Sequence, residues 1–278
     1  MKKFVLCLGI AAFLLPVCLS SCQKEEPKDE PKQTDNSFVE FNANGVKFTM
    51  ILVEHGSFVK GEMTKLMYHT PVILTKDYYI GKYEVTQDLW EAVMGAEANP
   101  SYFKGANLPV NNITWNDCIA FIDKLNGLTG KTFRLPTECE WEFAARGGNN
   151  LEPYTFSGSN DVDEVAWYKD NSDNQVHAVG EKKANALKLY DMTGNAIEWV
   201  QNPMIEGYYK TDTLVDPNPT APNPQFRVLK GGCYYLEHGK YESLSVSANF
   251  AEVPTAREES LGFRLREFGY PEPKDYFK

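Results

Sequence analysis

Two carboxylates seven positions apart bracket a glycine turn in the segment Asp191-Met192-Thr193-Gly194-Asn195-Ala196-Ile197-Glu198-Trp199. If the chain folds round one point, Asp191 and Glu198 supply anionic oxygens, and backbone carbonyls complete the shell of about six to eight oxygens that calcium prefers. Magnesium, which demands a stricter octahedron, fits less well. Alternatively, both acids cap turns beside a buried Trp199. The spacing leaves both interpretations open.

Cysteine thiols could supply a second kind of chemistry. The number of cysteines left in the folded part depends on how the N-terminal segment is processed. Residues 1–21 combine Lys2 and Lys3 with a short apolar run, as a secretory signal does. The closing Leu19-Ser20-Ser21-Cys22 resembles a bacterial lipobox, so we predict a lipoprotein signal peptide and acylation of Cys22; a plain signal peptide is the alternative. Acidic and proline-containing residues 22–37 then form a tether, which predicts a cell-surface lipoprotein anchored in the outer-membrane lipid.

Three of the six cysteines then remain in the folded part, namely Cys118, Cys139 and Cys233. An odd number makes no disulfide framework, although one disulfide is possible in an oxidising compartment. Cys118 and Cys139 lie in amphipathic helical patterns, where cysteine acts as a small buried hydrophobe. We expect three free thiols.

Composition narrows the class of partner. The chain has 278 residues, a formal charge of −10 and 42% hydrophobic residues, which suits an ordinary globular domain. Nucleic-acid binding requires clustered Lys and Arg to contact phosphates, and the sequence has no basic stripe. We therefore expect no nucleic acid among the partners.

Local signals predict the elements that position these residues. Residues 38–41 and 46–50 flank Asn44-Gly45, which predicts a β-hairpin. Thr86, Thr114 and Thr137 precede amphipathic segments that end at Gly95, Gly127 and Gly147-Gly148, which predicts three short helices. Beyond residue 148, Gly, Pro, Asn and Asp interrupt short apolar runs. Residues 38–272 are thus predicted to form a single loop-rich α+β domain.

Five ordered blocks within about residues 46–266 resemble the formylglycine-generating enzyme (sulfatase-modifying factor) family: 81–86, 133–148, 189–199, Gly231-Gly232 and 261–264. The resemblance implies a compact α+β domain related to the C-type lectin fold. It also implies a calcium site formed by the side chain of Asp191, the carbonyls of Gly194 and Ala196, and the carboxylate of Glu198. The family's second calcium site has no clear counterpart between Val165 and Gly180.

The resemblance does not extend to the family's catalytic metal. Its enzyme oxidises a sulfatase cysteine to formylglycine with oxygen, using copper held by two cysteine thiolates, the soft ligands that select Cu(I). At those two positions this chain has Leu236 and Tyr241, and no cysteine follows residue 233. Cys233 falls on a family serine. Copper is therefore not expected, and the four histidines, 55, 69, 177 and 238, form no pair typical of the family's iron-binding relatives.

Two hypotheses of different classes follow. The first is a non-catalytic family member, a pseudoenzyme, that binds a glycan, a peptide or an envelope protein. Its candidate contact residues lie in predicted exposed loops: Tyr208, Tyr209, Tyr234, Tyr235 and Glu237. Ordinary loop packing is the alternative for each of these residues. The second hypothesis is an active oxidase that converts sulfatase cysteine to formylglycine through a rearranged metal site involving Cys233.

Overall fold

The N-terminal hairpin forms where the sequence predicts it. The computed structural model describes residues 37–61, 69–151, 153–209, 212–239 and 242–268; the predicted signal peptide, Cys22 and nearly all of the tether lie outside these ranges. β1 (Phe38–Ala43) pairs antiparallel with β2 (Val46–Val53). Asn44 and Gly45 have φ of 49° and 95°, which a tight hairpin turn matching the strand twist requires.

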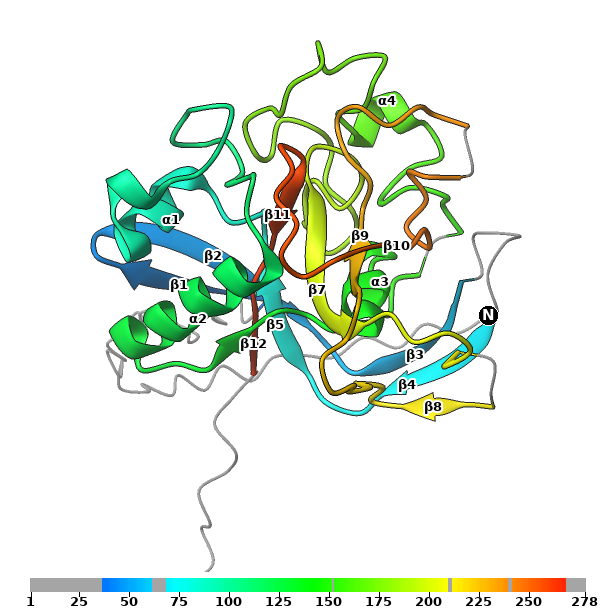
Figure 1. The fold of residues 1–278 in the computed structure, drawn as a ribbon. Helices are drawn as coiled ribbons and strands as arrows, with labels where there is room; N and C mark the ends of the chain where they lie inside the picture. The colour runs from blue at the N-terminus through cyan, green and yellow to red at the C-terminus, as the bar shows by residue number, and fades with distance from the viewer. Residues whose placement is uncertain (1–36, 62–68, 152, 210–211, 240–241, 269–278) are drawn as a thin grey trace, which may run out of the picture. The chain divides into compact units, whose positions relative to one another are not determined.

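The hairpin belongs to a five-stranded sheet of order β1-β2-β5-β12-β6, whose other strands are β5 (Tyr78–Gly81), β12 (Arg266–Phe268) and β6 (Phe133–Arg134). The last described strand, β12, thus lies between two strands from the first half of the chain. Helices α1 (Gln87–Met94) and α2 (Trp115–Thr129) lie beside the hairpin, as Figure 1 shows.

A second sheet has the order β10-β9-β7-β11, from β10 (Phe250–Glu252), β9 (Arg227–Lys230), β7 (Ile197–Pro203) and β11 (Leu261–Phe263). Its central strand β7 is buried at six of its seven positions. The parallel pairing of β11 with β7 sets Gly262 opposite Glu198. A third sheet joins β3 (Gly56–Lys60), β4 (Thr70–Leu74) and β8 (Leu214–Val215).

Two helices begin with the predicted capping boxes. The side chains of Thr114 and Thr137 each accept a hydrogen bond from the backbone N–H three residues later. The acids at those later positions, Asp117 and Glu140, each accept a hydrogen bond from the backbone N–H of the threonine. The predicted end of the second helix at Gly127 is wrong, because α2 continues to Thr129. It ends at Gly130, whose left-handed φ of 65° closes the last turn. Short helical turns also form at η1 (Ala96–Ala98) and α4 (Val162–Val165).

Helix α3 (Glu138–Ala145) is buried on all sides and carries three acids into the interior, of which Glu138 and Glu142 pair with cations from other elements and from the end of the helix. Glu138 pairs with Lys60 of β3, with Nζ 2.6 Å from Oε1. Glu142 pairs with Lys230 of β9 at 3.2 Å and with Arg146 at 2.9 Å. We call these five residues the α3 charge cluster. Because buried charges require close partners, this cluster fixes β3 and β9 against α3.

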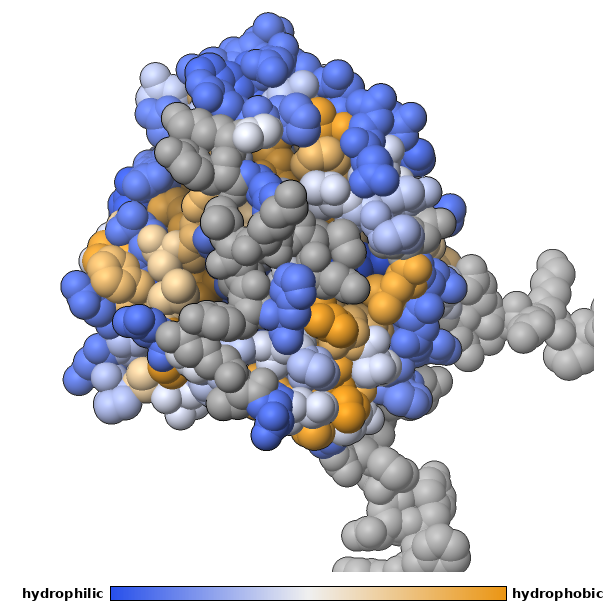
Figure 2. Space-filling view, turned by 90° about the vertical axis from the view of Figure 1, so that its right-hand side faces the viewer, coloured by the Kyte–Doolittle hydropathy of each residue, from blue (hydrophilic) through white to orange (hydrophobic). Residues whose placement is uncertain are grey.

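These sheets and helices form one compact α+β domain, with much irregular chain beyond residue 148, as predicted. Cys118, Cys139 and Cys233 are buried and free, as predicted. No helix among the described residues is long and apolar enough to cross a bilayer. Figure 2 shows one face of the molecule, on which patches of apolar residues lie among polar ones.

Candidate functional site

The predicted metal-binding segment folds into a tight buried turn before β7. Asp191 and Asn195 have left-handed φ of 55° and 58°, which the short polar side chains of these residues tolerate. Gly194 has φ of 80°, and a Cβ at this position would lie 2.3 Å from the carbonyl oxygen of Trp167. Only glycine fits here. Asn195 N then donates to this same carbonyl at 2.9 Å. The turn therefore depends on the glycine that first marked it in the sequence.

Glu198, at the start of β7, is fully buried and bound by two side chains. Arg264 Nε lies 2.9 and 2.7 Å from the two carboxylate oxygens, and Arg264 Nη2 lies 2.6 Å from Oε1. Trp141 Nε1 donates to Oε2 at 2.7 Å. Arg264 also donates to the carbonyls of Gly81 and Tyr190 at 3.1 and 3.0 Å. This arginine therefore joins the end of β5, the turn and β7.

A third buried carboxylate, Glu84, holds the other side of the turn. It accepts hydrogen bonds from Asn195 Nδ2 and from Ala196 N, both at 2.8 Å. Asp191 accepts one from Gly180 N at 2.8 Å. We call Glu84, Asp191, Glu198 and Arg264 the turn charge cluster. Its three acids outnumber its single cation.

The excess of acids appears in the pKa values. Burial, reinforced by the charges of Asp191 and Glu198, raises the pKa of Glu84 well above its usual range. Burial also raises the pKa of Asp191 to about 6, although Gly180 N–H and Arg264 oppose this rise. The cluster therefore favours a proton or another cation at neutral pH.

The structure brings the four predicted calcium ligands into this one turn, and Asp191, Gly194, Ala196 and Glu198 are all buried. These four residues match only part of a calcium coordination shell. Glu198 already accepts four contacts through its two oxygens, so it would bind a metal only by exchanging partners. Among the described residues, no three or more His, Cys, Asp or Glu side chains form a metal-binding group. The calcium site stays a prediction.

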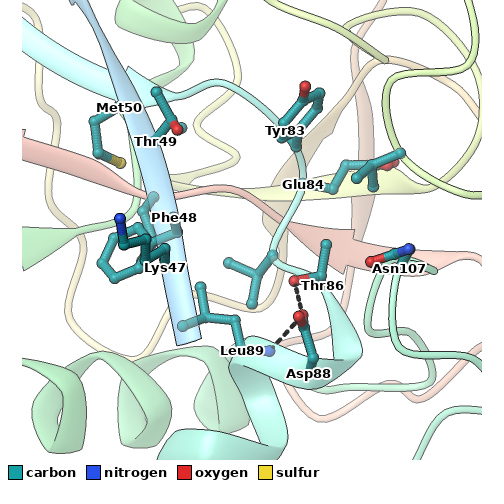
Figure 3. A pocket seen from close by; sticks show the side chains of 14 residues that line it. Lys47, Phe48, Thr49, Met50, Tyr83, Glu84, Thr86, Asp88, Leu89 and Asn107 are labelled. Atoms are coloured by element: carbon teal, nitrogen blue, oxygen red, sulfur yellow. Dashed lines mark hydrogen bonds between the residues drawn. The ribbon is translucent and has the colours of Figure 1, made fainter. Parts of the chain in front are cut away.

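A small cavity of about 180 Å³ adjoins the turn charge cluster. In Figure 3, Lys47 and Thr49 of β2 line one side, and Thr86 and Asp88 line the other. Glu84 also lines this cavity, but its side chain extends away from β2. Because its carboxylate binds the turn, the role of Glu84 here is to hold the side chain of Asn195 and the backbone of Ala196.

Cys233 lies in a different environment from a copper-binding thiolate. It is 1% exposed, and burial raises the pKa of its thiol to about 12, although hydrogen bonds with Tyr235 and Ser260 oppose this rise. At neutral pH the free thiol is therefore protonated, and a metal ion would have to displace this proton in order to bind. Leu236 is half-buried three positions on. Tyr241 lies outside the described residues.

Beside Cys233, four aromatic rings follow one another edge to face. The centroid distances are 5.0 Å from Tyr102 to Phe103, 5.7 Å from Phe103 to Tyr234 and 5.3 Å from Tyr234 to Tyr235. We call these residues the aromatic row. Its two ends are exposed, Tyr102 by 63% and Tyr235 by 42%. The sequence missed Tyr102 and Phe103, which lie more than 130 positions before Tyr234.

The other predicted contact residues have different surroundings. Tyr234 was expected to be exposed but is buried, because Phe103 packs against its ring. Tyr209 is half-buried, with Lys60 Nζ 4.4 Å from its ring centre. Tyr208 stacks edge to face on Tyr209, and exposed Glu237 pairs with Lys169. Of the predicted set, only Tyr235 therefore combines wide exposure with a place in the aromatic row.

Comparison with known proteins decides the family. Residues 37–267 match the family described as the sulfatase-modifying factor enzyme 1-like domain. The chain belongs to this family. The chaperone protein LppX of Paenibacillus barcinonensis is 35% identical over 235 residues, covering 66% of this chain and 77% of LppX.

Two further relatives bear on the family and the fold of this chain. The Streptomyces coelicolor formylglycine-generating enzyme is 29% identical over 172 residues, which cover 57% of this chain. The chain spans about half, 52%, of that enzyme's length. The structure of Treponema denticola variable protein 1 superposes with a TM-score of 0.74 at 30% identity, covering 83% of this chain and 99% of the other. The family and fold implied by the sequence blocks are thus confirmed.

Sequence reasoning missed Glu84 and Arg264 as partners of the turn. Both lie in blocks that carry the family resemblance, at residues 81–86 and 261–264. A charged residue inside a family block is a usable signal, but the sequence alone does not pair Arg264 with Glu198 over 66 positions or Glu84 with Asn195 over 111 positions.

Proposed function

We propose that this chain is a non-catalytic member of the sulfatase-modifying factor family that binds a partner through the aromatic row. It is tethered to the outer face of the outer membrane by acylated Cys22. The observation that carries the proposal is the exposure of Tyr102 and Tyr235 at the two ends of a row of packed rings, beside a single protonated thiol.

The packing of the row supports a binding role. Phe103 and Tyr234 support the two exposed rings from behind, so little side-chain entropy is lost when a ligand contacts them. Rigid tyrosines provide a large apolar area with a polar edge, and such residues are enriched at protein interfaces. The row therefore suits a ligand that presents a flat or apolar face.

The surface charge near the aromatic row and the name of one relative favour a polypeptide ligand over a glycan or a folded envelope protein. Glu258 and Glu259 are exposed, and their charges contribute to raising the pKa values of Tyr235 and Tyr234 behind the larger effect of burial. An acidic border suits a peptide that carries basic residues. The relative from Paenibacillus barcinonensis is named a chaperone, a kind of protein that acts on polypeptides. Glycans and folded envelope proteins are the other outcomes of the test.

Peptide and glycan arrays test this proposal. The domain should bind peptides that combine apolar and basic residues, and replacing both Tyr102 and Tyr235 by Ala should weaken binding at least about tenfold. Phe38→Ala is the matched control, because Phe38 is 45% exposed and lies outside the row. A folded domain that binds nothing on either array would contradict the proposal. So would equal binding by the double variant.

The competing function is an oxidase that uses Cys233, and it is favoured by the formylglycine-generating enzymes among the relatives. Incubation with Cu(I), oxygen and a sulfatase-motif peptide separates the two functions. We expect the peptide mass to stay unchanged. A mass loss that matches conversion of cysteine to the aldehyde, and that disappears in Cys233→Ala, would establish the oxidase.

The calcium and membrane assignments belong to the same proposal. The excess of acids in the turn charge cluster supports a calcium ion at Asp191, Gly194, Ala196 and Glu198, where it would neutralise buried charge. Acylation of Cys22 predicts that a labelled fatty acid is incorporated into the chain. It also predicts that Cys22→Ser releases the protein from the membrane fraction.

A further inference from the structure

Strand β2 loses one of its two neighbours partway along its length. Residues 50–53 pair with β1 on one side and with β5 on the other. β5 ends at Gly81, and the next hydrogen bond, from Lys82 N to Thr49 O at 3.0 Å, is the last between the two segments. Lys82 O instead accepts from Tyr190 N at 3.1 Å, which shows that the chain turns away from β2 here. Among the described strands, the part of β2 before Thr49 therefore keeps only β1 as a neighbour.

The register of the sheet gives the direction of the backbone groups along this stretch. In antiparallel strands, successive residues direct their N–H and C=O groups to opposite edges. Leu52 N donates to Ser37 O, just before β1, at 2.8 Å, so even-numbered residues of β2 face β1. The N–H of Thr49 and the N–H and C=O of Lys47 therefore point to the edge that β5 has left. Within the described part of the chain, no group forms a hydrogen bond with any of these three.

The cavity of about 180 Å³ that adjoins the turn charge cluster lies along this open edge. Figure 3 shows residues 83–86 across the gap from β2, with Asp88 and Leu89 of α1 below them. The buried side chains of Val85, Leu89 and Leu265 make part of the wall apolar. Pockets that enclose a drug-sized ligand measure about 300–1,000 Å³, so this cavity suits a short segment of a ligand.

Asp88 places an anionic group with spare capacity on the rim of the cavity. Its Oδ1 accepts from the hydroxyl of Thr86 and, at 2.7 Å, from Leu89 N, whereas its Oδ2 has no hydrogen-bond partner in the described ranges. Lys47 is the cation of the lining. Its side chain is 70% exposed and its Nζ lies 3.6 Å from Glu40, which balances its charge. The rim therefore offers a carboxylate oxygen to a basic side chain.

We propose that the open edge of β2 binds a short, extended polypeptide segment, which adds a strand to the first sheet in the gap that β5 leaves. Carbonyls of the segment accept from the N–H groups of Lys47 and Thr49, and one of its N–H groups donates to Lys47 O. An apolar side chain of the segment lies against the wall, and a basic side chain pairs with Asp88 at the rim. In this mode of recognition, main-chain hydrogen bonds give affinity and side-chain contacts give specificity.

A polypeptide matches these groups better than a small molecule does. The three open groups follow one another along a strand, with the spacing that pairs with a second main chain. The outer edge of β1 has groups of the same kind at Glu40 and Asn42, but neither residue lines the cavity. The site shares no residue with the aromatic row, so it is independent of the partner surface proposed above.

Amide hydrogen exchange of the full chain, measured with and without two pentapeptides, tests the site. The probe is acetyl-Val-Lys-Val-Lys-Val-amide, and its analogue carries a methyl group on every backbone nitrogen. The probe should slow exchange of the Lys47 and Thr49 amides at least about tenfold, while the amides of Glu40 and Asn42 exchange at unchanged rates. The methylated analogue should slow neither pair. No protection of Lys47 and Thr49 by the probe at millimolar concentration would overturn the proposal. Equal protection by the analogue, or equal protection of Glu40 and Asn42, would do the same.

Variants at the edge and at the rim locate the binding. Thr49→Pro removes the open N–H without breaking a hydrogen bond of the sheet, and it should weaken probe binding about tenfold. Glu40→Pro is the matched control, because it removes an open N–H from the outer edge of β1.

If Thr49→Pro fails to fold, Asp88→Asn gives the second measurement. It should weaken binding of the lysine probe about threefold and leave unchanged the binding of a peptide with Glu in place of Lys. Unchanged probe binding by folded Thr49→Pro, or by Asp88→Asn where the proline variant does not fold, would contradict the assignment.

Discussion

The α3 charge cluster and the turn charge cluster are both buried, yet they have opposite balances of charge. Around α3, three cations surround two acids, and the positive charges of Lys230, Lys60 and Arg146 lower the pKa of Glu142 despite its burial. At the turn, three acids share Arg264, and the pKa values of Glu84 and Asp191 rise.

This difference shows that local charge balance, rather than burial alone, decides the state of a buried acid. Where cations are in excess, the acid stays ionised and holds the elements together. Where acids are in excess, the site favours an added proton or metal ion. The α3 charge cluster is thus complete in itself, whereas the turn charge cluster has the electrostatics of a cation site.

The largest expected effect comes from breaking the α3 charge cluster. Glu142→Gln removes the negative charge that pairs Lys230 and Arg146, and it should lower the free energy of unfolding by about 3–5 kcal/mol. Chemical denaturation measures this loss. Glu40→Gln is the control, because Glu40 is exposed and its contact with Lys47 is 3.6 Å long, so stability should hardly change. Similar losses in both variants would refute the special role of the cluster.

Breaking the turn charge cluster should have a somewhat smaller effect. Arg264→Met leaves Glu198 buried without its cation, and we expect a loss of about 3 kcal/mol in the free energy of unfolding. Denaturant titration of both variants ranks the two clusters. Arg257→Met is the matched control, because that arginine is about half exposed in its pair with Asp117. A loss no larger than that of the control would mean that Arg264 is dispensable.

Calcium should sharpen the contrast between the clusters. A metal bound only by the folded state adds about 2.7 kcal/mol at a hundredfold excess over Kd, or roughly 5–10 °C in Tm for a domain of this size. Chelation with EDTA should therefore lower Tm, and Glu198→Gln should remove most of the difference. Glu40→Gln should retain it. Identical melting of the wild type in calcium and in EDTA would rule out the calcium site.

Acid should affect the α3 charge cluster gradually. The folded-state pKa of Glu142 lies below the ordinary value of 4.5, so the unfolded state binds the proton first as pH falls. The stability supplied by ionised Glu142 is therefore complete above about pH 4.5 and is lost as pH falls further, by at most about 1.4 kcal/mol per pH unit. Urea titrations between pH 6 and 3 should show a shallower decline for Glu142→Gln. Parallel curves for variant and wild type would contradict the assignment.

Local features of the fold could be predicted from the sequence, since their causes lie within a few residues. The capping boxes at Thr114 and Thr137 and the Asn44-Gly45 turn each need only a short segment. Gly127 was misjudged as a helix end because a glycine also fits inside a helix. Which glycine adopts a left-handed φ depends on the packing of the whole helix.

The candidate site could be predicted only in part. Asp191 and Glu198 were recognised because they flank one turn, but their neutralising and clamping partners come from other elements. Glu84 bonds Asn195 over 111 positions, and Arg264 bonds Glu198 over 66 positions. No local pattern encodes such pairs; the topology of the sheets brings them together.

The position of β12 has a consequence for how the molecule is made. This strand pairs with β5 on one side and with β6 on the other, so the first sheet lacks an interior strand until residues 266–268 have been synthesised. Arg264, just before it, reaches the turn at the same late stage. A nascent chain that emerges from its N-terminus therefore has an unpaired strand edge and uncompensated acids until residues 264–268 arrive, and the first sheet and the turn charge cluster can be completed only after these residues have been synthesised.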